Sequence, residues 1–244
     1  MKHPFKRRMN TLAQAILISL TATTIANAAT ANSALEYASV TELGNMMASN
    51  ELTAVALVEH LTQRIADLDK QGPALHAVIE LNPQALDIAK ALDEERAAGQ
   101  TRGALHGIPV LLKDNFDTAD GLQTSAGSLA MVGQPAAADA FVVKQLRDAG
   151  AIVLGKTNMS EWAYVRDMDL PHGWSGRGGQ GKNPHLASES TCGSSSGSAS
   201  AVAAGYAPIS LGTETNGSIT CPASANGVVG VKPTLGLLSR SGIV

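Results

Sequence analysis

Residues 191–224 constrain the fold of this chain most, because nearly all of their side chains are very small. Gly, Ser and Ala fill most positions from 193 to 205, an apolar segment follows at 207–211, and residues 213–218 read Thr-Glu-Thr-Asn-Gly-Ser. Glycine allows positive φ and close approach to a ligand. Gly/Ser-rich runs are often flexible linkers. The apolar residues interspersed in this one instead favour a tightly folded loop that binds a small ligand.

Composition points to a globular protein with one sizeable core. The chain has 244 residues, 44% of them hydrophobic and 16% charged, which is typical of a folded domain. The formal net charge is −3 and only 3% of residues are aromatic. Without a basic stripe or stacking aromatic residues, we expect no nucleic-acid partner.

The first 28 residues read as a secretory signal peptide. Lys2, Lys6, Arg7 and Arg8 precede a short apolar run, and Ala-Asn-Ala ends at residue 28, the pattern of a cleavable leader. We therefore expect an exported protein, periplasmic or secreted, that has no membrane contact after cleavage. Residues 29–244 then form part of a single domain.

Two cysteines, Cys192 and Cys221, both lie inside the Gly/Ser stretch. An exported protein could pair them, but two cysteines are too few for a disulfide framework. We expect small buried packing residues instead. The sequence has no Cys-x-x-Cys or His-rich spacing, so no zinc site is expected.

Apolar spacing predicts helices alternating with strands, the order typical of an α/β fold. Two helices are expected within 41–69, the second capped by Thr53, with further helices after Pro83, at 138–149 and after a turn at 155–161 capped by Ser160. Strands are expected at 77–81, 108–112, 152–154 and 207–211.

Ser218 is the best nucleophile candidate, because it follows a strand and a turn that can present backbone N–H groups to an oxyanion. A serine needs a base, and none of the six histidines has an obvious catalytic setting. A lysine made neutral by burial can serve instead. Lys113, at the end of the apolar strand at 108–112, fits this role, although an ordinary lysine at a strand end would look the same.

Several segments together resemble the amidase signature family, in the family's order and over about residues 41–244. They are the Gly-Ser-Ser-Ser-Gly-Ser run at 193–198, the Gly-Thr-Glu-Thr-Asn-Gly-Ser-Ile run at 212–219, the strand Gly-Ile-Pro-Val-Leu-Leu-Lys-Asp at 107–114, and shorter matches at 155–161, 183–184 and 230–234. Among members of the family, the sequences of the two serine-bearing segments are most similar to those of bacterial peptide amidases.

This resemblance implies a Ser–Ser–Lys triad. Ser218 would be the nucleophile, Lys113 the base, and Ser194 a bridging serine whose peptide bond to Gly193 is cis. Activity would then rise from acid toward neutral or alkaline pH, because the pKa of Lys113 must fall by about 3 units, roughly 4 kcal/mol.

The resemblance also implies the surroundings of the triad. The N–H groups of Thr215, Asn216 and Gly217, with that of Ser218, would form the oxyanion hole, and Ser195 would help to hold Lys113. The fold would be a mixed β-sheet covered by α-helices on both faces. No metal or organic cofactor is implied, and the substrate would be a peptide C-terminal amide or a small acyl amide.

The chain departs from the family's usual pattern in three ways. Asn216 stands where many members have Gly, and Glu214 and Thr220 stand where many have Asp and Arg, a pair of changes that we interpret as linked. The family is also about twice as long, so we expect an N-terminal part of one amidase-signature domain with little activity alone. The alternatives are the glutamine-hydrolysing subunit of an amidotransferase, a non-catalytic chain with the same fold, and a generic serine hydrolase.

Overall fold

A four-stranded mixed sheet forms the centre of the molecule. The computed structural model describes residues 35–165, 167 and 169–244, so the predicted signal peptide lies outside the described residues. The strand order is β1 (Val78–Leu81), β3 (Ile152–Thr157), β2 (Pro109–Lys113) and β6 (Ile209–Leu211). Strand β2 runs parallel to β3 and β6, whereas β1 pairs antiparallel with β3. The predicted α/β class with a mixed sheet is confirmed.

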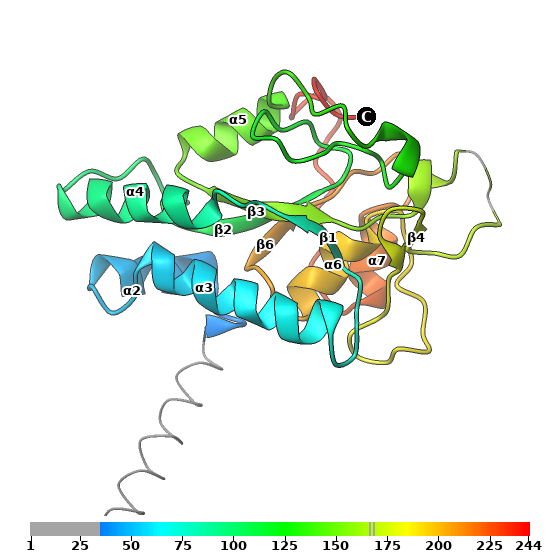
Figure 1. Ribbon diagram of the computed structural model, residues 1–244, viewed down its shortest axis with the longest axis horizontal. Helices are drawn as coiled ribbons and strands as arrows, with labels where there is room; N and C mark the ends of the chain where they lie inside the picture. The colour runs from blue at the N-terminus through cyan, green and yellow to red at the C-terminus, as the bar shows by residue number, and fades with distance from the viewer. Residues whose placement is uncertain (1–34, 166, 168) are drawn as a thin grey trace, which may run out of the picture.

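Helices cover both faces of this sheet, as predicted. Figure 1 shows α3 and α6 on one face and α5 on the other. The bounds are α2 Val40–Ala48, α3 Ala54–Ile65, α4 Ala85–Ala97, α5 Phe141–Asp148, α6 Ser196–Ala203 and α7 Thr220–Ala225. Within the described part of the chain, no helix has the length and apolar character needed to cross a bilayer.

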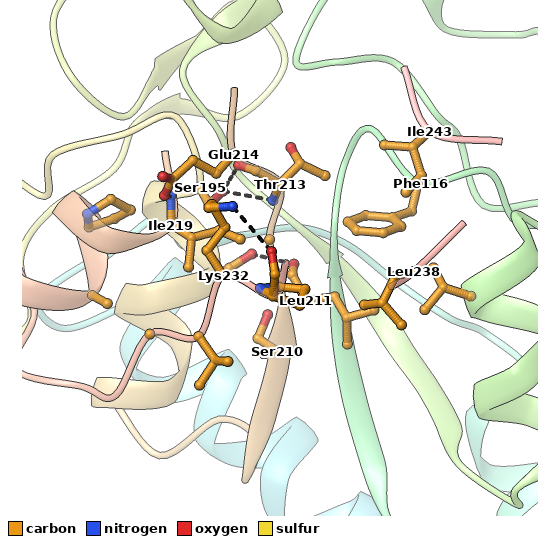
Figure 2. Close-up of a pocket in the computed structure, with 18 of the residues that line it drawn as sticks. Phe116, Ser195, Ser210, Leu211, Thr213, Glu214, Ile219, Lys232, Leu238 and Ile243 are labelled. Atoms are coloured by element: carbon orange, nitrogen blue, oxygen red, sulfur yellow. Dashed lines mark hydrogen bonds between the residues drawn. The ribbon is translucent and has the colours of Figure 1, made fainter. Parts of the chain in front are cut away.

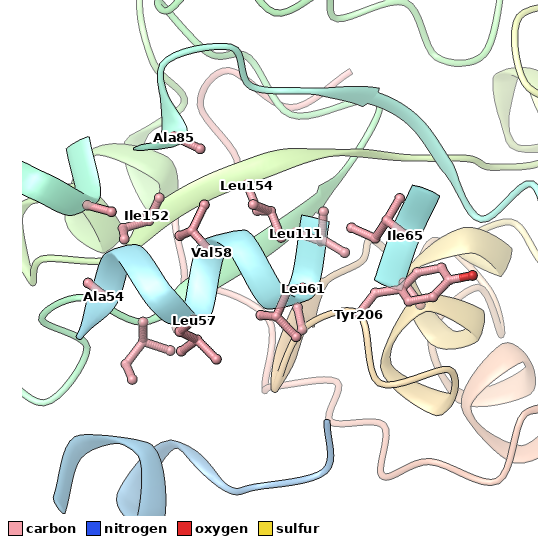
Figure 3. Packing of buried hydrophobic residues seen from close by; sticks show 14 of the residues in the cluster. Ala54, Leu57, Val58, Leu61, Ile65, Ala85, Leu111, Ile152, Leu154 and Tyr206 are labelled. Carbon is pink, nitrogen blue, oxygen red and sulfur yellow. The ribbon is translucent and has the colours of Figure 1, made fainter. Parts of the chain in front are cut away.

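Alternation along β2 decides which way Lys113 points. Leu111 packs in the core with α3, whose Leu57, Val58 and Leu61 lie beneath the strands (Figure 3). Val110 and Leu112 belong to the opposite cluster, with Val143 of α5. Because successive side chains on a strand face opposite ways, Lys113 shares the face of Leu111. That is the face on which α6 packs against the sheet.

Side-chain caps account for where the first helices begin. At α2, Ser39 Oγ accepts the N–H of Glu42 and the Glu42 carboxylate accepts the N–H of Ser39, a capping box. Thr53 Oγ1 accepts the N–H of Ala56 at the start of α3, so its predicted role is confirmed. After Ile65 the helix continues as a π-helix, Ala66–Lys70.

Two local predictions were wrong. Residues 155–157 continue β3 rather than turn, and only a short 3-10 helix follows, Glu161–Tyr164. Ser160 caps nothing with its side chain, because its hydroxyl donates to Tyr164 Oη at 2.6 Å. Helix α7 was not predicted. Two further short strands, β4 (Trp174–Ser175) and β5 (Gly179–Gln180), form a hairpin beyond the 3-10 helix.

Candidate active site

Lys113 lies at the carboxyl end of β2 and is fully buried. Its Nζ lies 2.7 Å from Ser194 Oγ, 2.8 Å from Thr213 Oγ1 and 3.3 Å from the Thr213 carbonyl oxygen. No carboxylate of the described residues lies within 4.0 Å of Nζ. Burial without a counter-charge lowers the pKa of Lys113 from 10.5 to about 7. The structure therefore brings the predicted base to the predicted bridging serine.

Thr213 is a site residue that the sequence analysis missed. Its hydroxyl oxygen accepts from Lys113 Nζ and also from Asn115 Nδ2 at 3.0 Å. The only signal was its place directly before the nucleophile turn, which does not say which way a side chain points. Thr213 thus links the end of β2 to the chain that leaves β6.

Ser194 occupies a loop with little free space. The peptide bond between Gly193 and Ser194 is cis, as the resemblance implied. A Cβ added to Gly193 would lie 2.3 Å from Tyr164 Oη and 2.4 Å from Ser160 Oγ, so no larger residue fits. The carbonyl of Ser194 accepts the N–H of Ser160 at 3.1 Å. These contacts fix the loop that carries the serine beside Lys113.

Ser195 differs from its predicted role of holding Lys113. Its hydroxyl donates to the Thr213 carbonyl at 3.0 Å and accepts the Thr213 N–H at 3.1 Å, so it holds Thr213 instead. The reason is geometric, because Thr213 lies between Ser195 and the lysine. The N–H of Ser195 also donates to the Ser218 carbonyl at 3.2 Å.

Ser218 is 7% exposed, at the end of the turn that precedes α7. Its main chain is joined to the Ser194 loop by the Ser195–Ser218 hydrogen bond. Among the hydrogen bonds of residues 35–165, 167 and 169–244, none joins Ser218 Oγ to Ser194 Oγ. The loops that carry the two serines are therefore neighbours, with the hydroxyls not in direct contact.

Glu214 organises the nucleophile turn. Its Oε2 accepts the N–H groups of Ile219 at 2.8 Å and Thr220 at 2.9 Å, and the Thr220 hydroxyl at 3.1 Å. Partial burial alone raises the pKa of this carboxyl, but the N–H groups of Thr220, Ile219 and Gly217 outweigh it and lower the pKa. Glu214 and Thr220, which differ together from the family's usual Asp and Arg, are thus joined by direct hydrogen bonds.

The N–H groups predicted for the oxyanion hole are not equivalent. The Gly217 N–H helps to lower the pKa of the Glu214 carboxyl, and Gly217 has a φ of +77°. For the N–H groups of Thr215 and Asn216, the described part of the chain offers no hydrogen-bond acceptor, and both residues are exposed. These two N–H groups are free to bind an incoming oxygen.

The two cysteines form a disulfide, which corrects the expectation that they are unpaired packing residues. Cys192 and Cys221 have Cα atoms 5.9 Å apart, a separation that a disulfide spans readily. Cys221 is exposed and Cys192 is partly exposed. The chain between them, over a separation of 29 residues, folds back through α6 and β6, so that the ends meet.

A cavity of about 760 Å³ opens beside this cluster. Ser194, Ser195 and Thr213 contribute polar atoms to its wall. Figure 2 shows Ser195, Thr213 and Glu214 gathered at one side of the pocket, with Phe116, Leu238 and Ile243 at another. Within the described residues no group of three or more His, Cys, Asp or Glu could hold a metal ion. The predicted bridging serine Ser194 therefore lines a largely apolar cavity, and the predicted nucleophile Ser218 lies outside its lining, between the lining residues Thr215 and Ile219 in the chain.

A buried lysine beside a serine that follows a cis bond, with a second serine on a neighbouring glycine turn, is the arrangement that the resemblance to the amidase signature family implies. The Amidase family model matches residues 56–244, and the chain belongs to that family.

Named relatives agree with this assignment. The chain is 50% identical over 212 residues to a protein of Arabidopsis thaliana named "Probable amidase", covering 86% of this chain and 41% of the relative. It is 43% identical over 204 residues to a glutamyl-tRNA(Gln) amidotransferase subunit of Acidothermus cellulolyticus, covering 83% and 39%. The chain thus spans about two fifths of the length of these relatives.

Solved structures give the same fold. The native peptide amidase from Stenotrophomonas maltophilia superposes with a TM-score of 0.82 at 58% identity, covering 84% of this chain and 42% of that one. An amidase family protein from Bacillus anthracis superposes with a TM-score of 0.85 at 44% identity, covering 90% and 43%.

Proposed function

We propose that this chain carries the catalytic centre of an amidase that cleaves a carboxamide C–N bond through an acyl-enzyme. The observation that carries the proposal is the 2.7 Å contact between buried Lys113 Nζ and Ser194 Oγ. A neutral amine has two hydrogens and one lone pair. The two Thr213 oxygens can accept the hydrogens, which leaves the lone pair to accept the Ser194 hydroxyl hydrogen.

The proposed reaction moves one proton along this chain of groups. Lys113 takes the proton of Ser194 as Ser194 takes that of Ser218, and Ser218 Oγ attacks the amide carbonyl carbon. The N–H groups of Thr215 and Asn216, with that of Ser218, stabilise the oxyanion. The C–N bond then breaks, the leaving amine or ammonia takes the proton by the reverse route, and water releases the acid. Ser218 Oγ must first rotate toward Ser194, since hydrogen bonds at a reaction centre often tighten only when substrate is bound.

The proposed substrates are peptide C-terminal amides, with small acyl amides second. The similarity to the Stenotrophomonas maltophilia peptide amidase supports this order, as does the apolar lining of the cavity. The glutamine-hydrolysing subunit of an amidotransferase is the alternative, favoured by relatives named as amidotransferase subunits.

We also propose that the protein is exported to the periplasm or secreted. The leader-like sequence at 1–28 and the partly exposed disulfide support export, because disulfides persist mainly in oxidising compartments. Export argues against the amidotransferase alternative, whose tRNA-linked work belongs to the cytoplasm.

Because we expect little activity from this chain alone, hydrolysis of a panel of peptide amides, simple acyl amides and glutamine is measured on a full-length relative that carries the same residues, and labelling by a serine-directed fluorophosphonate is measured on the 244-residue chain. We expect label on Ser218, loss of labelling and hydrolysis in Ser218→Ala, and severe impairment in Ser194→Ala. Glutamine as the preferred substrate would favour the amidotransferase. Near wild-type turnover by Ser218→Ala would exclude the mechanism, and absence of both label and hydrolysis would favour a non-catalytic chain.

A further inference from the structure

The loops that carry Ser194 and Ser218 have few side chains with which to hold each other. Gly and Ser occupy every position from 193 to 198, and every residue other than Gly in the turn at 213–218 is polar. Such residues bury little apolar surface, so packing alone fixes their separation weakly. Covalent and hydrogen-bonded links must do this instead.

Besides the two Ser195–Thr213 hydrogen bonds described above, three links join the two loops. Cys192, two residues before Ser194, is bonded to Cys221, three residues after Ser218. The Ser195 N–H donates to the Ser218 carbonyl at 3.2 Å. Asn226 Nδ2, fully buried, donates to the Thr191 carbonyl at 3.0 Å. The covalent link and the Asn226–Thr191 hydrogen bond both flank the two serines on their outer sides, and the covalent link lies nearer to them in the chain.

The disulfide attaches the start of helix α7 to the Ser194 loop. The Cys221 N–H donates to the Gly217 carbonyl at 2.8 Å, so the cysteine belongs to the same turn as the nucleophile. The disulfide passes any displacement of the Ser194 loop directly to this turn. The Asn226 link holds the other end of α7 and remains when the disulfide is reduced.

We propose that the Cys192–Cys221 disulfide is a positioning element that sets the separation of Ser194 and Ser218, and that a small dithiol reductant slows the enzyme by opening it without unfolding the chain. This inference rests on the proposed function of the two serines. The exposure of Cys221 gives a reductant access to its sulfur.

The reduction step is an ordinary thiol–disulfide exchange. A reductant thiolate attacks Cys221 Sγ, the S–S electron pair leaves on Cys192 as a thiolate, and a mixed disulfide forms. The second thiol of the reductant then closes its own ring and releases Cys221. Two electrons pass from the dithiol to the protein, and the two cysteines end as thiols once protonated.

The experiment compares the oxidised 244-residue chain with the chain reduced by dithiothreitol. Alkylation and mass measurement count the thiols, and the rate at which a fluorophosphonate labels Ser218 reports the geometry of the serines. We expect two thiols, unchanged circular dichroism and a labelling rate at least tenfold lower. Bridging the thiols with diiodomethane, which inserts one methylene group, should restore most of the rate. A reduced chain that labels within twofold of the oxidised chain would overturn the proposal.

Hydrogen exchange by mass spectrometry gives a readout that does not depend on catalysis. We expect faster exchange on reduction at 191–195 and 217–221, with β2 and β3 unchanged. Uniformly faster exchange, or none, would overturn the positioning role. If the oxidised chain takes no label, the proposed function fails, whereas the exchange result still decides whether the disulfide holds the loops.

A double variant, Cys192→Ser with Cys221→Ser, is the matched control for other effects of the reductant. It should label slowly from the outset and be unaffected by dithiothreitol. A reductant effect that persists in this variant would contradict the assignment to this disulfide. Should the variant fail to fold, reduction of the folded wild-type chain still provides the test.

Discussion

Lys113 and Lys156 are both fully buried and lie at the ends of neighbouring parallel strands, one register position apart. Burial lowers the pKa of each, to about 7 for Lys113 and about 8 for Lys156. Only one of them contacts a serine of the proposed triad. The comparison separates what burial does to a lysine from what its partners do.

The partners of Lys156 suit an ammonium ion. Its Nζ donates to the Phe116 carbonyl at 2.6 Å, to the Gln123 carbonyl at 3.0 Å and to Thr124 Oγ1 at 3.1 Å. Burial lowers its pKa most, while the carboxylates of Asp114, Asp120 and Glu80 raise it. Lys113 lacks such carboxylates and faces a hydroxyl that can give up its proton. A buried lysine can therefore act as a base only where the lone pair of its neutral Nζ points at a group that can give up a proton, as Ser194 does beside Lys113.

The largest expected effect is on turnover. Lys113→Met removes the proposed base, and we expect kcat to fall by about 10³-fold or more, in the range typical of lost general base catalysis. Steady-state hydrolysis of a peptide amide measures this.

Lys156→Met is the matched control. It leaves carbonyl groups without donors, so the free energy of unfolding should fall by about 1–3 kcal/mol, with kcat per folded molecule within about tenfold of wild type. Equal loss of turnover in both variants would break the distinction between the two lysines.

The next effect is on pH dependence. Only neutral Lys113 can accept a proton, so kcat/KM should rise with pH through a midpoint of about 7 and fall about tenfold per pH unit below it. The profile should show no second rise near 8 from Lys156. A flat profile down to pH 4 would contradict a lysine base.

A smaller effect comes from the hydroxyls beside each lysine. Thr213→Val removes one of two oxygens that accept from Lys113 Nζ, so the lone pair is no longer held toward Ser194 and kcat should fall about tenfold, or about 1.4 kcal/mol. Thr124→Val makes the same change at Lys156 and should leave kcat within twofold. Both should lower the free energy of unfolding by about 1 kcal/mol, so unequal kinetics at equal stability would support a positioning role for Thr213.

The last effect is on the pH dependence of stability. Because the pKa of Lys113 is lowered in the folded state, the unfolded chain binds more protons between pH 7 and 10.5, and stability rises with pH in that window. From pH 7 to pH 9 the wild type should gain about 2 kcal/mol relative to Lys113→Met. Urea unfolding of both proteins at the two pH values measures this difference, and parallel curves would argue against the lowered pKa.

The sequence predicted that Lys113 lies at the end of an apolar strand, because an apolar run halted by charged residues is a local pattern. The apolar run at 108–112 predicts the strand that carries Lys113, and the glycine-rich segments at 193–198 and 212–218 predict the loops that carry the serine hydroxyls. These features depend on residues close together in the chain, so they could be predicted.

Other features of the site could not be predicted, because they depend on how segments far apart in the sequence pack against one another. Thr213 reaches Lys113, and Ser195 does not, because of the path of the chain after β6. The Cys192–Cys221 pairing depends on how α6 and β6 fold back, which spacing of 29 residues does not specify. Helix α7 has six residues without apolar periodicity, and the Glu214 carboxylate that accepts N–H groups at its start precedes it by six positions.

Direct titration of Lys113 tests the central claim. In protein labelled with ¹³C at the lysine ε-carbons, the signal missing from Lys113→Met identifies this residue. We predict that it titrates near pH 7, below the signal missing from Lys156→Met. A Lys113 that stays charged above pH 9 would contradict its assignment as the base.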